Sequence, residues 1–178
     1  MLYLFLAEGF EELEAIAPLD LLRRAGVAVR TVGVGGRTVT GAHGLPVTCD
    51  EDAAAWEPDG SFAGVILPGG PGYAALAESP AVLAAIRLAE EQGKLLAAIC
   101  AAPAILGARG CLQGRRAVCF PGYEAQLLGA EVSLDPVMRD GNIITARGAG
   151  VAVAFGLALV AYLRSPEEAA RIERAIQA

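Results

Sequence analysis

The sequence is poor in several residue types, and each shortage argues against a class of protein. Only 6% of the 178 residues are aromatic, and a single histidine, His43, leaves a zinc site short of ligands. The net charge is −6, and no cluster of Lys and Arg offsets it, which argues against direct nucleic-acid binding. The four cysteines contain no CxxC pair and form no dense framework, which argues against structural disulfides.

Long hydrophobic runs are also missing. The two most apolar stretches, residues 95–108 and 148–163, are shorter than the roughly 20 residues of a membrane-spanning helix. The N-terminus has no basic flank and its apolar run stops at Glu8, unlike a signal peptide. We therefore expect a soluble, cytoplasmic protein.

Strand and helix patterns alternate along the chain. Short apolar runs predict strands at residues 2–6, 27–34, 65–67, 95–99, 117–120 and 142–145. Helices are predicted at residues 11–25, 80–92, 101–108, 149–163 and from Ser165, the N-cap of a capping box with Glu168. Residues 37–49 predict a β-ribbon and residues 50–61 a connection. This order predicts one α/β domain over residues 1–178, a doubly wound, mostly parallel sheet with helices on both faces.

Cys100 stands where a buried strand passes directly into a helix, in the run Ala-Ile-Cys-Ala-Ala-Pro. Such a turn lifts the side chain toward a cleft, as in nucleophile elbows. Free N–H groups at the helix N-terminus favour thiolate, so the position predicts a lowered pKa for the Cys100 thiol. The alternative is a buried structural cysteine, which is the favoured interpretation of Cys49, Cys111 and Cys119.

Two further features are expected near Cys100, because parallel sheets gather their chemistry at the carboxyl ends of the strands. The Pro-Gly-Gly turn at residues 68–70 could present backbone N–H groups to a ligand, with an ordinary tight turn as the alternative. Glu14 shares an apolar helix face with Pro18, which predicts a raised carboxyl pKa; a solvated glutamate is an equal alternative. His43, in the glycine-rich ribbon, is predicted to be a surface histidine.

Four motifs occur in a specific order along the chain. They are an acidic opening helix over residues 8–26, Val-Ile-Leu-Pro-Gly-Gly at 65–70, Ala-Ile-Cys-Ala-Ala-Pro at 98–103 and Thr-Ala-Arg-Gly-Ala-Gly at 145–150. Together they resemble the ThiJ/PfpI (DJ-one) superfamily, and its YajL-like bacterial branch in particular. Each motif alone is weak, but in this order they cover nearly the whole chain.

The resemblance implies a flavodoxin-like fold and a homodimer. It makes Cys100 the nucleophile or redox centre, Glu14 the carboxyl partner of its sulfur, and the backbone N–H groups of Gly70 and Ala101 an oxyanion hole. Members are described as glyoxalases that convert methylglyoxal to lactate, as deglycases, as oxidative-stress sensors or as chaperones. The glyoxalase reaction implies no cofactor and no metal.

Two positions depart from relatives in this superfamily. Protease-like members have a histidine after the nucleophile, where this chain has Ala101, which argues against peptidase activity. Many members also have a histidine near the site where this chain has Phe120, so a general acid/base is missing. Cys119 is expected near the same strand end and is a candidate resolving thiol. Three more residues are candidates for shaping the pocket: Gly69, Asp20 and Arg147.

The sequence therefore favours a cysteine-dependent, cofactor-free enzyme acting on small reactive dicarbonyls, a glyoxalase III-like lyase or a protein/nucleotide deglycase. In this hypothesis Cys100 attacks the aldehyde and Glu14 moves a proton between adjacent carbons. The alternative is a redox sensor or chaperone that responds to oxidation of Cys100. An amidotransferase-like hydrolase is a weaker interpretation, because it needs a histidine partner.

Overall fold

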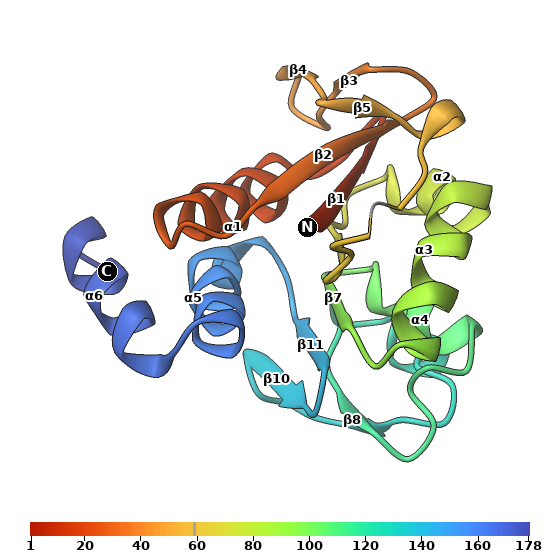
Figure 1. The fold of residues 1–178 in the computed structure, drawn as a ribbon. Helices are drawn as coiled ribbons and strands as arrows, with labels where there is room; N and C mark the ends of the chain where they lie inside the picture. Colours follow the sequence, from red (N-terminus) through yellow and green to blue (C-terminus); the bar gives the residue numbers. More distant parts are fainter. Residues whose placement is uncertain (59) are drawn as a thin grey trace.

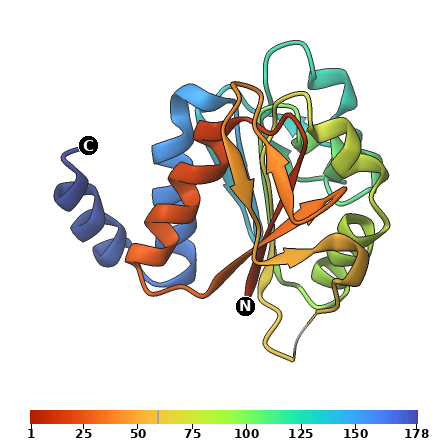
Figure 2. The same cartoon turned by 90° about the horizontal axis from the view of Figure 1, so that it is seen from above.

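A central sheet lies between two layers of helices in the computed structural model, which describes residues 1–58 and 60–178 (Figures 1 and 2). Among these residues seven strands form the sheet in the order β10-β11-β7-β6-β1-β2-β5, with only the edge strand β10 antiparallel. The strands are β1 (Leu2–Ala7), β2 (Val29–Val34), β5 (Glu51–Asp52), β6 (Gly64–Leu67), β7 (Leu95–Ile99), β10 (Val137–Asp140) and β11 (Ile143–Ala146). The predicted doubly wound, mostly parallel α/β fold is confirmed.

Strand β1 explains why the core has two halves. Every residue of β1 is buried, and alternate side chains point to opposite faces of the sheet. Tyr3 and Phe5 enter the core on one face, whereas Leu4 and Leu6 enter the core on the other. A continuous apolar run is what a parallel strand covered on both faces requires.

The helices divide between these two faces (Figures 1 and 2). One layer contains α1 (Glu12–Arg24), α5 (Ala152–Leu163) and α6 (Pro166–Ile176), and the other contains α2 (Tyr73–Glu78), α3 (Pro80–Glu91) and α4 (Pro103–Ala108). Three short 3₁₀ turns are η1 (Ala53–Ala55), η2 (Glu124–Gln126) and η3 (Ala149–Val151). No helix within residues 1–58 and 60–178 is long and apolar enough to cross a membrane.

The prediction of a strand over residues 117–120 is wrong for most of these residues. Only β8 (Arg116–Ala117) is a strand there, and it pairs with β9 (Glu131–Val132) in a separate sheet. The next residues use their donors elsewhere: the Val118 N–H binds Thr145 Oγ1 at 2.9 Å, and the Phe120 N–H binds the Cys100 carbonyl at 2.8 Å. This segment is therefore bonded to Thr145 and Cys100 instead of extending a ladder.

Other differences are smaller. The predicted ribbon is confirmed as β3 (Thr38–Thr40) paired with β4 (Pro46–Thr48), but the connection over residues 50–61 contains β5 and η1, while Asp59 lies outside the described residues. Ser165 Oγ caps α6 by accepting the Glu168 N–H at 3.2 Å. The Glu168 carboxylate binds Arg171, so only this half of the predicted capping box is found.

Candidate active site

Three loops meet at the carboxyl ends of β1, β6 and β7. From β1 the chain passes to β2 on one side and returns to β6 on the other, so the strand order reverses between β1 and β6. In open α/β sheets such a reversal opens a crevice where ligands bind. Glu14 follows β1, Gly69 and Gly70 follow β6, and Cys100 follows β7. The topology thus brings the predicted residues to one edge of the sheet.

Cys100 occupies a strained turn that its neighbours hold in place. Its φ of 67° is uncommon for a residue with a side chain. The Cys100 N–H donates to the Ala146 carbonyl at 2.9 Å, and its carbonyl accepts the Phe120 N–H at 2.8 Å. The backbone has the shape expected of a nucleophile elbow.

Glu14 is the buried partner of the cysteine. The residue is 1% exposed, and its carboxyl group lies beside the Cys100 thiol, where each group shifts the pKa of the other. The Gly69 N–H donates to Glu14 Oε2 at 2.8 Å. A Cβ atom on Gly69 would lie 2.7 Å from both Glu14 Oε2 and Cys100 Cβ, so only glycine fits between them.

Two backbone donors face the sulfur. The N–H groups of Ala101 and Gly70 both lie near enough to the Cys100 thiol to act against the rise in its pKa. Gly70 has a φ of 80°, and a Cβ there would lie 2.6 Å from the Gly9 carbonyl, so the turn that aims this N–H requires glycine. Donors in this arrangement can stabilise negative charge on the sulfur or on an oxygen attached beside it.

The thiol and the carboxyl group share one proton over a wide pH range. Burial raises the pKa of Glu14 to about 6, and the Glu11 charge adds to the rise, while hydrogen bonds from Gly69 and Cys100 oppose it. Burial also raises the pKa of Cys100 to about 12; the Glu14 charge adds to this, and the N–H groups of Ala101 and Gly70 oppose it.

The raised pKa of Glu14 agrees with the sequence, whereas the lowered pKa predicted for Cys100 is wrong. Helix α4 begins only at Pro103 and ends at Ala108, so it offers a weak dipole against burial and a neighbouring carboxylate. Thiolate forms most readily when the shared proton moves to Glu14, because the main charge opposing it then disappears.

Two tyrosines that were not predicted from the sequence lie near Cys100. The Tyr73 and Tyr123 rings meet edge to face with centroids 5.6 Å apart. Phe120 packs against Tyr123 with centroids 6.5 Å apart, and its ring lies over Gly148. The two tyrosines are fifty residues apart, so their spacing does not predict a contact. The only shared sequence signal is the Pro-Gly pair that precedes each of them.

Some of the predicted pocket residues lie elsewhere. Asp20 is exposed on α1 and pairs with Arg24 at 2.6 Å, and its assignment to the pocket stays a prediction. Cys119 and Arg147 line a separate hollow of about 110 Å³ together with Leu134. Burial raises the pKa of the Cys119 thiol to about 11, and the charge of Glu124 adds to this. A resolving role for Cys119 stays a prediction.

His43 lies on the surface, as predicted, with 72% of its side chain exposed. Its Nδ1 is 2.9 Å from Glu12 and 3.5 Å from Glu11. The hydrogen bond to Glu12 raises the pKa of His43 most, and the charges of Glu11 and Glu12 add to the rise. Burial raises the pKa of Glu12, but hydrogen bonds from His43 outweigh it and leave the value at about 2. These three side chains could hold a metal ion, with ligand atoms within 4.8 Å of one another. Their mutual hydrogen bonds explain the cluster without one, and we assign it no metal.

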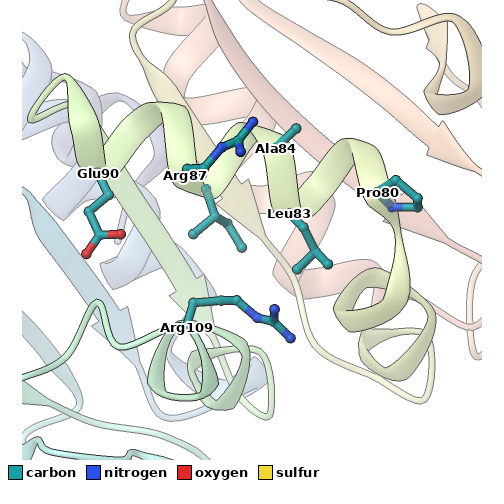
Figure 3. Close-up of a pocket in the computed structure, with 7 residues that line it drawn as sticks. Pro80, Leu83, Ala84, Arg87, Glu90 and Arg109 are labelled. Atoms are coloured by element: carbon teal, nitrogen blue, oxygen red, sulfur yellow. The ribbon is translucent and has the colours of Figure 1, made fainter.

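A larger hollow of about 420 Å³ lies along α3 and next to the end of α4 (Figure 3). Its lining combines apolar and charged residues: Pro80, Leu83, Ala84, Ile86, Arg87, Glu90 and Arg109. The lining shares no residue with the cysteine site, and none of its residues was predicted to be functional. We assign no function to this hollow.

Known proteins resemble this chain over nearly its full length. The Parkinson disease protein 7 homolog of Danio rerio is 36% identical over 173 residues, covering 94% of this chain and 92% of the relative. A glutathione-independent glyoxalase of Caenorhabditis elegans is 33% identical, covering 90% and 87%. A deglycase of Pyrococcus abyssi is 34% identical, covering 81% and 87%.

Solved structures agree with the fold. A cysteine-to-alanine mutant of a DJ-1 superfamily protein from Salmonella typhimurium has a TM-score of 0.91 at 37% identity, covering 99% of this chain and 97% of its own. Oxidized DJ-1 of Toxoplasma gondii has a TM-score of 0.93 at 32% identity, with the same coverage. Assignment to the YajL-like branch stays a prediction. Residues 1–162 match the DJ-1/PfpI family, and the chain therefore belongs to that family.

Proposed function

We propose that the protein is a cysteine-dependent, cofactor-free enzyme that converts a small dicarbonyl such as methylglyoxal to a 2-hydroxy acid. The observation that carries the proposal is the buried Glu14 carboxyl beside the Cys100 thiol, with two backbone N–H donors near the same sulfur. The glyoxalase and deglycase names of two relatives support the same class of reaction.

The first step uses the proton shared by the two side chains. Glu14 accepts the thiol proton, and the Cys100 sulfur attacks the aldehyde carbon to form a hemithioacetal. The developing oxyanion lies near the sulfur, within reach of the N–H groups of Gly70 and Ala101. This oxygen then takes a proton, which leaves Glu14 ionised.

The second step moves hydrogen between the two carbons of the dicarbonyl. Ionised Glu14 removes the proton from the carbon bonded to sulfur, giving an enediol, and returns it to the neighbouring carbon. The resulting thioester is hydrolysed by water to lactate and the free Cys100 thiol. A carboxyl pKa of about 6 suits Glu14 to both directions of this transfer near neutral pH.

The test is direct detection of lactate by chromatography, with Cys100→Ser, Glu14→Gln and the control Cys111→Ser. The parent and the control should form lactate over many turnovers, and the two site variants should form none above the uncatalysed rate. Loss of methylglyoxal without lactate would indicate a thiol adduct only and would contradict the proposal.

A redox sensor is the second candidate, because the groups around the sulfur also suit its oxidised forms. Peroxide would transfer an oxygen to the Cys100 sulfur as its O–O bond breaks, giving a sulfenic and then a sulfinic acid. A protonated Glu14 and the N–H groups of Gly70 and Ala101 could bind the added oxygens. Absence of lactate together with a sulfinic-acid mass at Cys100 would favour this candidate.

Assembly and location complete the proposal. We propose a homodimer, as the resemblance implies, to be measured by sedimentation equilibrium. All four cysteines are free, which suits the reducing cytoplasm that we propose as the location. A monomer at micromolar concentration would contradict the proposed homodimer.

A further inference from the structure

Phe120 adjoins the candidate active site but brings no ionisable side chain to it. Its contribution is a backbone N–H that binds the Cys100 carbonyl at 2.8 Å. Glu14 can move a proton between carbons, but the two oxygens of the substrate must also exchange a proton. The reaction proposed above therefore needs another donor.

Tyr73 and Tyr123 lie on the two turns that flank the cysteine. Tyr73 begins α2, and its N–H donates at 3.1 Å to the carbonyl of Gly70, whose own N–H faces the sulfur. The Tyr123 N–H donates at 3.1 Å to the carbonyl of Phe120, whose N–H binds Cys100. Each tyrosine is thus one hydrogen-bonded turn away from a residue that contacts Cys100.

The side chains converge from these two turns. Their rings meet at 84° with centroids 5.6 Å apart, so Tyr73 is close enough to act on the Tyr123 phenol. Both residues are only partly buried. Tyr123 is also near enough to Cys100 for the sulfur's charge to act on its phenol.

The electrostatic state suits donation and not removal of a proton. The hydrogen bond with Tyr73, the charge interaction with Tyr73, burial and the charge of Cys100 together raise the pKa of Tyr123 above its ordinary value. The phenol therefore stays protonated near neutral pH, where it can donate to an oxygen that gains negative charge.

We propose that Tyr123 is a catalytic proton donor to the substrate's second carbonyl oxygen and that Tyr73 is the residue that positions it. This inference rests on the dicarbonyl reaction proposed above. As Glu14 removes the proton from the sulfur-bearing carbon, the C–H electrons form the C=C bond and the carbonyl π electrons take the Tyr123 proton. When the enediol collapses to the thioester, the hydroxyl on the sulfur-bearing carbon returns a proton to the phenolate. No oxidant or reductant is consumed.

The test compares kcat and KM for methylglyoxal in Tyr123→Phe, Tyr73→Phe and Tyr123→His, measured by lactate formation. Tyr123→Phe should lower kcat by about 10²-fold with little change in KM, as expected for loss of a general acid. Tyr73→Phe should have a smaller effect of about tenfold, since the donor remains but loses its partner. Tyr123→His should recover part of kcat, because imidazole also donates a proton.

Tyr162→Phe is the matched control. Tyr162 is on α5, and its ring packs against the Arg139 guanidinium of β10. The rate of Cys100 alkylation by iodoacetamide should stay unchanged in the tyrosine variants, which separates proton donation from a structural effect on the thiol. Unchanged kcat in Tyr123→Phe beside an active parent would overturn the inference and leave the proposed function standing. An inactive parent would end both. If Tyr123→Phe does not fold, an unchanged kcat in Tyr73→Phe overturns the inference.

Discussion

At the scale of single residues, the site depends on one proton shared between Glu14 and Cys100. Both groups are buried, and each is less easily ionised because the other is close. Two consequences can be measured separately, one in the stability of the fold and one in the reactivity of the thiol.

Glu14→Gln should remove a pH dependence from the stability of the protein. A carboxyl pKa raised from 4.5 to about 6 means that the folded state holds a proton that the unfolded chain has released between these values. The contribution of Glu14 to stability therefore falls as pH rises through this window, by about 2 kcal/mol in total, and is constant above it. Glutamine keeps an acceptor for the Gly69 N–H and carries no charge.

Urea unfolding at about pH 4 and about pH 7.5 checks this expectation. The variant should match the parent at the lower pH and exceed it by about 2 kcal/mol at the higher pH. Asp20→Asn, which removes an exposed carboxylate from the same helix, is the control. Equal stabilities of Glu14→Gln and the parent at the higher pH would show that the buried charge costs nothing.

The same substitution should make Cys100 more reactive toward iodoacetamide while stopping turnover. The charge and hydrogen bond of Glu14 both raise the thiol pKa, so their loss lowers it and increases the thiolate fraction near pH 8. Alkylation rates followed by mass spectrometry across pH measure the shift. A slower reaction in Glu14→Gln would mean that proton acceptance by the carboxyl group outweighs its effect on the thiol pKa, and would contradict this prediction.

At the scale of elements, the position of Glu14 depends on how closely α1 packs against α5. Gly156 of α5 faces α1, and a Cβ at this position would lie 3.0 Å from Pro18 Cα and 2.6 Å from Leu21 Cδ1. Backbone atoms cannot give way as a side chain can, so a larger residue must push the helices apart. The glycine in this apolar helix thus keeps Glu14 within reach of the sulfur.

Gly156→Val should destabilise the protein by about 1–3 kcal/mol through overpacking. Displacement of α1 should also separate Glu14 from Cys100, so lactate formation should fall further than the folded fraction does. Chemical denaturation and lactate assays on the same samples test both parts. Gly150→Ala, where an added Cβ meets no atom within 4 Å, is the control. A Gly156→Val protein as stable and active as this control would contradict the packing argument.

At the scale of the whole molecule, we propose that residues 1–178 form one cooperative unit. The C-terminal helix α6 is outermost in its layer (Figure 1), yet Ile172 is buried in the same core as Leu4 and Phe155. Trp56, the only tryptophan, lies in the opposite core between Tyr3 and Phe5. The two cores pack on opposite faces of the same sheet, so they should unfold together.

Thermal unfolding should therefore give one midpoint by two probes. Tryptophan fluorescence reports the core around Trp56, and far-ultraviolet circular dichroism reports all helices, including those on the other face. Coincident curves are expected for a single domain. Two separated midpoints would show that the helical layer of α1, α5 and α6 unfolds independently of the other core.

Local patterns in the sequence were sufficient for the general plan of this protein. Continuous apolar runs are buried strands because a parallel sheet has no solvated face, and the glycine turns and Cys100 follow those strands directly. The edge strand β10 was missed, although Gly141, with φ of 60°, marks the two-residue hairpin loop that joins it to β11.

Only the tertiary structure decided the electrostatic state of the site and its full membership. The pKa of Cys100 depends on burial and on the charge of Glu14, which comes from another segment, so a rule for one helix terminus predicted the wrong direction. Asp20 and Glu14 are on one helix, yet burial separates their roles. Tyr73 and Tyr123 meet because two distant turns close over the same strand ends, a contact that sequence spacing does not encode.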